Sequence, residues 1–146
     1  MKKIMILVML FFSLTLPLFA TSEEFYEIIT NADEINGEDW INFAREEKLS
    51  YLFGLSAALN FSEGIAYYTN CKVVVKAISS SFFDITGVTY GTLIDMTDEF
   101  YSDPANRLIP VIGAEFYCIQ KLKGSPPDVL TNIILSLRQE AARLKI

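Results

Sequence analysis

The sequence predicts an all-α protein, a single compact bundle of four to five helices that follows an N-terminal signal peptide. Two observations predict this fold class. Apolar residues recur at intervals of three and four along most of the chain after residue 37, and helix start and stop signals separate these segments. We therefore expect a signal peptide at residues 1–20 and one helical domain at residues 21–146.

The start of the chain has the pattern of a signal peptide. Lys2 and Lys3 supply positive charge, and a nearly unbroken apolar run follows at residues 4–16. Pro17 then breaks the helix, and Ala20 offers a small residue for cleavage. The alternative is an uncleaved N-terminal anchor, but the run is shorter than the roughly 20 residues that a spanning helix needs. We expect cleavage after Ala20, no stable membrane anchoring afterwards, and a periplasmic or secreted protein.

Charge and composition argue against several classes of function. The formal net charge of -6 becomes -8 after cleavage, because ten of the twelve Lys and Arg then remain beside eighteen Asp and Glu. An acidic chain without a basic cluster is not expected to bind nucleic acid or an anionic membrane. The chain has no His, which excludes imidazole bases, His-containing triads and nearly every zinc site. We expect no enzyme activity, no cofactor and no metal.

The two cysteines, Cys71 and Cys118, both follow the signal peptide. In an oxidising compartment such a pair forms a disulfide more often than it remains as two thiols. A loop of this length would stabilise the fold by about 3–4 kcal/mol. Cys118 also lies in an apolar helical pattern that suits a buried free thiol. We predict the Cys71–Cys118 disulfide, with two free thiols as the alternative.

The first helical segments follow the signal peptide. Residues 21–37 are polar and acidic, and we expect a short docking helix there. Asn36 can cap a second helix, and Asp39 stands three residues later in capping-box position. Apolar spacing then predicts one long helix to about Phe61. Its stripe consists of Ile41, Ala44, Lys48, Leu52, Leu55 and Leu59.

Two residues in this long segment break the local pattern. Lys48 falls within the apolar stripe, and Gly54 costs about 1 kcal/mol relative to Ala in a helix. We interpret Gly54 as a close approach of another helix and Lys48 as a side chain whose amine reaches water. The alternative is that Lys48, Tyr51 and Gly54, on successive turns of one face, line a pocket.

Residues 71–81 fit either a helix or a strand. The run Val73–Val75 favours a strand, whereas positions 71, 74, 75 and 78 share one helical face. We expect a short helix that ends at residues 79–81, with a strand as the alternative.

Three more helices complete the predicted bundle. Thr89 caps a helix with an apolar side that includes Leu93 and Phe100. Residues 110–123 are apolar on most sides, which predicts a central helix that Gly124 ends. Residues 125–128, Ser-Pro-Pro-Asp, are a strong start signal for the last helix. Its stripe consists of Leu130, Ile133, Ile134, Leu137, Ala141 and Leu144.

A polar stretch at residues 100–111 joins two of these helices. We select four of its residues as candidates for binding, namely Tyr101, Asp103, Asn106 and Arg107. Lys48 and Tyr51 join this candidate set if the first long helix packs alongside. Arg107 can hold a carboxylate through two hydrogen bonds. The alternative is a buried polar clasp, in which these side chains satisfy backbone groups at helix ends.

Several short motifs together resemble a known group of proteins. They are Trp40, the Lys48-x-x-Tyr51-Leu52-x-Gly54 pattern, residues 87–93, residues 100–107, and an apolar helix that ends at Gly124. This order resembles small exported bacterial helical proteins of unknown function and, more distantly, the periplasmic Rap/Tai-type immunity proteins of type VI secretion. The resemblance implies a helical, often dimeric protein that neutralises a cell-wall amidase toxin by binding it. Unlike that family, this chain has only two cysteines, neither in the first long helix.

We therefore expect an exported, non-catalytic binding protein that acts on another protein, in an immunity-like role, with a homodimer as a further option. The alternative function is a small-ligand or lipid-binding module that uses the apolar bundle interior, with Lys48 or Arg107 as anchor. An enclosed apolar pocket of a few hundred Å3 would favour the alternative. An exposed apolar patch would favour protein binding.

Overall fold

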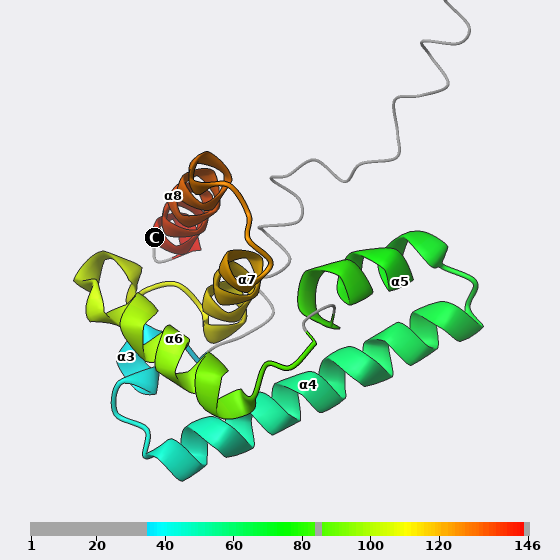
Figure 1. Ribbon diagram of the computed structural model, residues 1–146, viewed down its shortest axis with the longest axis horizontal. Helices are drawn as coiled ribbons and strands as arrows, with labels where there is room; N and C mark the ends of the chain where they lie inside the picture. The colour runs from blue at the N-terminus through cyan, green and yellow to red at the C-terminus, as the bar shows by residue number, and fades with distance from the viewer. Residues whose placement is uncertain (1–34, 84–85, 145–146) are drawn as a thin grey trace, which may run out of the picture.

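The computed structural model describes residues 35–83 and 86–144 as an assembly of packed helices (Figure 1). The predicted all-α class is confirmed. The predicted signal peptide and its cleavage site lie outside the described residues, as does the expected docking helix up to residue 34. In the part of the chain that is described, no helix is both long and apolar enough to cross a membrane. The elements are α3 (Gly37–Trp40), α4 (Arg45–Tyr68), α5 (Lys72–Ile78), a π-helical turn (Ser79–Phe83), α6 (Tyr90–Ser102), a 3-10 turn (Pro104–Asn106), α7 (Val111–Leu122) and α8 (Pro127–Leu144).

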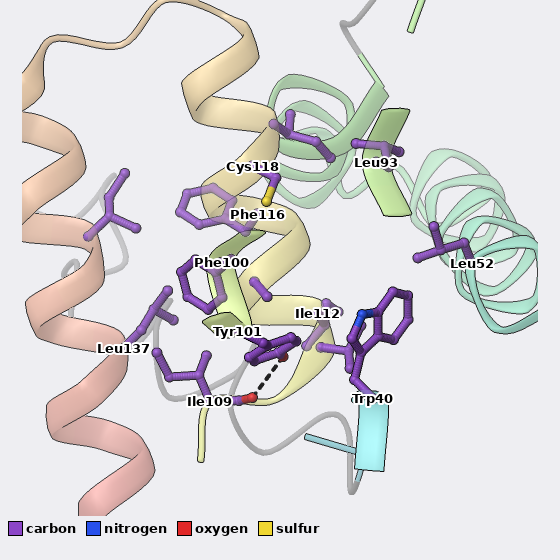
Figure 2. Close-up of a cluster of buried hydrophobic side chains, with 14 of the residues drawn as sticks. Trp40, Leu52, Leu93, Phe100, Tyr101, Ile109, Ile112, Phe116, Cys118 and Leu137 are labelled. Atoms are coloured by element: carbon purple, nitrogen blue, oxygen red, sulfur yellow. Dashed lines mark hydrogen bonds between the residues drawn. The ribbon is translucent and has the colours of Figure 1, made fainter. Parts of the chain in front are cut away.

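The helix α7 lies at the centre of the core, as its apolar composition predicts. It packs against α6 and α8, and its Val111, Ala114 and Cys118 side chains are almost fully buried. Figure 2 shows the core around it, to which α4 contributes Leu52 and α8 contributes Leu137. The predicted helix start at Pro110 is confirmed within one residue, because Pro110 is the N-cap of α7.

The predicted single helix from Asn36 to Phe61 is wrong, because the chain forms two helices there. Asn36 and Asp39 form the predicted capping box, but α3 ends at Trp40. The helix α4 starts at Arg45, where the Glu47 carboxylate accepts the Ala44 N–H at 2.7 Å. It then continues past the predicted end to Tyr68. The break lets α3 and α4 approach the core at different angles.

A glycine at the start of α3 permits its close packing on α6. A Cβ added at Gly37 would lie 2.4 Å from the Tyr101 ring and 2.8 Å from the Arg107 Cα. No side chain fits in that space, since real Cβ atoms do not approach other heavy atoms so closely. The chain just before α3 also pairs with the start of α7, where Val111 N donates to Ile35 O at 3.0 Å.

Residues 72–78 form a helix, as expected. The helix α5 packs on the C-terminal half of α4 (Figure 1). Ser79 to Phe83 then form one π-helical turn instead of a simple stop. This turn brings Phe82 into the core, where its ring centroid lies 6.1 Å from that of Phe116.

The later helix boundaries agree with the sequence signals. The Thr89 hydroxyl accepts the Thr92 N–H and caps α6. Gly124 has a φ of +76°, the left-handed conformation that glycine adopts readily at the end of a helix. The helix α8 begins at Pro127, and its Ile133, Leu137 and Ala141 are buried.

The predicted disulfide is wrong, because Cys71 and Cys118 are both free thiols. Cys71 is exposed in the turn between α4 and α5, whereas Cys118 is buried in α7. Burial, followed by the nearby Glu115 carboxylate, raises the pKa of the Cys118 thiol to about 12. Cys118 therefore behaves as a small apolar core residue, which was the alternative interpretation.

The close helix approach expected at Gly54 is also wrong. Gly54 is exposed on α4, and no atom lies within 4 Å of an added Cβ. Gly54 therefore destabilises the helix through its backbone freedom, and no close contact among the described residues requires a glycine at this position.

Replacing Gly54 with Ala is expected to raise the free energy of unfolding by up to about 1 kcal/mol. The new methyl group meets open space, and Ala loses less backbone entropy than Gly when a helix forms. Urea unfolding followed by circular dichroism measures the change. A lower urea midpoint for Gly54→Ala would contradict the open environment described for this position.

Candidate functional site

The polar stretch at residues 100–111 forms a buried clasp. The Asn106 side-chain amide donates to the Phe100 carbonyl at 2.7 Å, and Asn106 is only 3% exposed. The Tyr101 hydroxyl donates to the Ile109 carbonyl at 2.9 Å (Figure 2). These bonds satisfy backbone carbonyls near the end of α6 and in the connection to α7. Tyr101 and Asn106 thus take part in the clasp, and Asn106 also lines a pocket of about 150 Å3 together with Asp103. A binding role for these residues stays a prediction.

An arginine from α8 closes the clasp. Arg138 Nε donates to Asn106 Oδ1 at 2.8 Å, and Arg138 Nη2 donates to the Asp103 carboxylate. The Ala105 N–H also donates to Asp103, and this bond, followed by the Arg138 charge, lowers the pKa of that carboxyl. Arg107 Nε, by contrast, is buried without a hydrogen-bond partner among the described residues. A binding role for Arg107 stays a prediction.

Replacing Arg138 with Met is expected to lower the free energy of unfolding by about 1–3 kcal/mol. The change keeps an unbranched side chain but leaves the buried Asn106 oxygen without its donor, which has a cost of that order. The matched control is Arg107→Met, because it removes a guanidinium whose Nε has no partner. Urea unfolding measures both variants. An effect of Arg107→Met as large as that of Arg138→Met would contradict this assignment.

Lys48 and Tyr51 belong to a different contact, at the junction of α3, α4 and α6. The Lys48 ammonium lies 2.8 Å from Asp98 Oδ1 and 5.4 Å from the centroid of the Trp40 ring. The Trp40 indole N–H donates to the same Asp98 oxygen at 2.8 Å. Tyr51 packs edge-on against Trp40 at 6.2 Å. Lys48 thus pairs with a carboxylate instead of reaching water alone, and Gly54 does not share this contact.

The outer face of α4 carries an exposed row of apolar residues. Five of them follow one another at intervals of four and form one ridge of the helix. Phe53 is 53% exposed, Phe61 is 69% exposed and Ile65 is 49% exposed. The α4 ridge consists of Leu49, Phe53, Ala57, Phe61 and Ile65.

The middle of the α4 ridge also lacks charge, whereas the exposed Arg45 lies one turn before Leu49. No charged residue occurs between Leu49 and Ser62. Tyr67 and Tyr68, 73% and 89% exposed, extend the apolar surface at the C-terminal end of α4. The helix is apolar on two sides, since Leu52 on its inner face is buried in the core. Figure 1 shows α4 at the edge of the assembly, where α6 and α5 contact it.

A cavity of about 250 Å3 lies where α4 meets α6, α7 and the π-helical turn. Its walls are mostly apolar, with Ser56 and Asn60 from α4 as neutral polar groups. Glu115 from α7 also lines it and is only 3% exposed. The other lining residues are Leu52, Leu55, Leu59, Phe82, Val88, Tyr90, Leu93 and Ile119.

Glu115 is the most perturbed carboxyl group of the described residues. Burial raises its pKa to about 7, although the hydrogen bond from Thr97 acts in the opposite direction. Thr97 Oγ1 donates to Glu115 Oε1 at 2.6 Å. Among the described residues, no donor contacts the second carboxylate oxygen. A carboxyl group in such a place is expected to change its protonation near neutral pH.

The sequence contained a weak signal for each of these two features. Glu115 is the only charged residue within the apolar segment at residues 108–119, and an isolated acid in a central helix indicates a buried polar group. The α4 ridge was visible as an apolar helix side opposite the predicted core stripe. Both signals depend on knowing which face of each helix is buried.

Comparisons of the chain with protein families, with curated proteins and with solved structures find no match. Within residues 35–83 and 86–144, no three His, Cys, Asp or Glu side chains are grouped so that they could hold a metal ion. The two features from which we argue a function are the α4 ridge and the cavity at Glu115.

Proposed function

We propose that the protein is an exported, non-catalytic binding protein that acts through protein–protein interaction, with the α4 ridge as its contact surface. The observation that carries the proposal is the continuous apolar ridge on an exposed helix. Large apolar side chains gathered on one face are typical of recognition surfaces, because an isolated protein gains nothing by exposing them. An amphipathic helix of this kind binds through anchors spaced three or four residues apart.

The partner we propose is another polypeptide with an apolar groove or a second apolar helix face. Ridges at intervals of four pack into the grooves of a facing helix, and Phe61, the most exposed large side chain of the ridge, would be the main anchor. Aromatic anchors near the middle of an interface commonly carry much of its binding energy. If the role is immunity-like, as the motif resemblance suggests, the partner is an exported cell-wall amidase toxin. A second copy of this chain is the homodimer option.

The alternative function, a small-ligand or lipid-binding module, would use the cavity at Glu115. At about 250 Å3 this cavity is smaller than most drug-sized ligand sites, and it is too small for a whole lipid chain with its headgroup. Neither Lys48 nor Arg107 lines it, so the anchors expected from the sequence do not serve it. Protein binding is therefore the function we place first.

The test compares two exposed apolar positions. Phe61→Ser removes the most exposed large side chain of the α4 ridge, and Leu135→Ser removes an apolar side chain that is 55% exposed on α8, away from the ridge. We expect that a partner purified with the wild-type protein binds Leu135→Ser normally and binds Phe61→Ser at least about tenfold more weakly, in the range of an interface anchor. Isothermal titration calorimetry measures both affinities.

Three outcomes would contradict the proposal. They are a capture from periplasm that retains no protein, co-purification of a lipid in place of a protein, and unchanged binding by Phe61→Ser. Circular dichroism of both variants checks that the fold is intact, which we expect because both positions are exposed.

A further inference from the structure

The cavity at Glu115 combines features that a simple packing defect lacks. A buried carboxyl group lines an otherwise mostly apolar space, and its Oε1 already has a donor in Thr97. The second carboxylate oxygen has no donor among the described residues. A ligand that supplies a charged donor to this oxygen would form a charge-assisted hydrogen bond with it.

We propose that this cavity binds a small amphiphilic amine, with its ammonium group on the Glu115 carboxylate and its apolar body between α4, α6 and α7. No residue of the α4 ridge lines the cavity, although Phe53 of the ridge contacts Tyr90 of the cavity wall, with ring centroids 4.5 Å apart. The proposal therefore goes beyond the protein-binding function and does not depend on it.

The charges in the cavity favour a cation over an anion. Glu115 is the only acidic or basic residue among those that line it. A carboxylic acid ligand would meet the Glu115 carboxyl group and find no cation to balance it. A purely apolar ligand would fill the space but leave the second Glu115 oxygen unpaired. An ammonium group pairs with that oxygen and donates a charge-assisted hydrogen bond to it.

The size of the cavity limits the ligand. A dry cavity of about 150 Å3 holds benzene, so a cavity of about 250 Å3 suits an aromatic ring with a short amine chain. The rings of Phe82 and Tyr90 and the side chains of Leu55 and Leu59 would contact the apolar part. A phenylalkylamine of the size of 2-phenylethylamine is a suitable probe.

Binding is expected to depend on pH through Glu115. The groups around it are Thr97 and Tyr90 on α6, Cys118 on α7, Ser56 and Asn60 on α4, and the apolar Phe82 in the π-helical turn. Burial raises the pKa of the Glu115 carboxyl group to about 7, so this group is expected to govern binding near neutral pH. Because the amine binds the carboxylate form, its affinity should fall as the pH drops below about 7.

The experiment titrates 2-phenylethylamine, and separately the neutral 2-phenylethanol, into the purified protein while NMR chemical shifts are followed. We expect chemical-shift changes at residues that line the cavity. At pH 8 the affinity for the amine should be at least tenfold higher than that for the alcohol, and at pH 5 the ratio of the two affinities should be smaller. Glu115→Gln keeps the shape of the side chain and should abolish the preference. Leu59→Trp should fill the cavity and weaken the binding of both probes, although the Glu115 carboxyl group is still present.

Other results would overturn the proposal. They are equal affinity for the amine and the alcohol, an amine preference that survives in Glu115→Gln, and shifts confined to the exposed surface. The exposed Glu99→Gln change removes the same charge elsewhere and serves as the control for general electrostatic attraction. Loss of the amine preference in Glu99→Gln would also count against a site at Glu115. The affinity of the α4 ridge for its protein partner is measured in a separate experiment. The outcome of that experiment neither supports nor contradicts amine binding at Glu115.

Discussion

Replacing Trp40 with Ala is expected to lower the free energy of unfolding by about 3–5 kcal/mol, the range for truncating a fully buried large aromatic side chain. Trp40 is 0% exposed and joins α3 to α4 and α6. Its ring lies under the Lys48 ammonium and against Tyr51, and its N–H bonds Asp98. The Ala variant loses the packing of the ring and also leaves a cavity where three helices meet.

The matched control is Trp40→Phe, which keeps an aromatic ring but removes the indole N–H. We expect it to be destabilised by less than the Ala variant, because most of the buried apolar area remains. Trp40 is the only Trp in the chain, so unfolding must be followed by far-ultraviolet circular dichroism instead of fluorescence. A loss below about 1 kcal/mol for Trp40→Ala would contradict a central role of Trp40 in the core.

The second large effect is the pH dependence that Glu115 gives to stability. Its pKa is near the ordinary 4.5 in the unfolded chain and about 7 in the folded protein. Between these values the unfolded state releases the proton that the folded state retains, so the contribution of Glu115 to stability falls as the pH rises. This difference between the two pKa values corresponds to about 3 kcal/mol in the free energy of unfolding. That contribution is lost as the pH rises from about 4.5 to about 7.

Glu115→Gln isolates this contribution from those of the other carboxyl groups. The amide still accepts the Thr97 hydrogen bond but cannot ionise. We expect the variant to be similar to the wild-type protein near pH 4 and more stable by about 3 kcal/mol at pH 8. Urea unfolding at a series of pH values measures the difference. A difference that stays constant with pH would show that Glu115 is not buried in the folded protein.

Much of the fold follows from local signals in the sequence. The caps at Asn36 and Thr89 and the left-handed Gly124 lie where the sequence indicates them. The central position of α7 follows from its apolar composition, because a helix that is apolar on most sides must be surrounded by others. The polar clasp at Tyr101 and Asn106 was one of two interpretations, and the hydrogen bonds that it requires are present.

The errors come from features that local signals do not specify. After the break that follows α3, the N-cap of α4 is Ala44, which has no side chain that can cap, and only Glu47 marks this helix start. The disulfide was inferred from the compartment and the even number of cysteines, whereas pairing requires that the two side chains meet in space. Arg138 is distant in sequence from Asn106, so its role in the clasp depended on how α8 packs.

The candidate sites were harder to predict than the fold for the same reason. Leu52 and Phe53 are adjacent in the sequence, yet one is buried and the other forms part of the exposed α4 ridge. Hydrophobicity alone does not separate a core face from a recognition face. Glu115 likewise differs from a surface acid only through the burial of α7, which is a property of the assembled helices.

The measurement that tests the central claim most directly is site-specific photo-crosslinking in cells that produce the protein. A photoreactive phenylalanine analogue is placed at Phe61 on the α4 ridge, and in a parallel variant at Leu135 on α8, which is similarly exposed. We predict a discrete protein adduct from position 61, with another polypeptide or a second copy of this chain, and no such adduct from position 135. Crosslinking to lipid alone, or the same adducts from both positions, would contradict a protein-binding role of the α4 ridge.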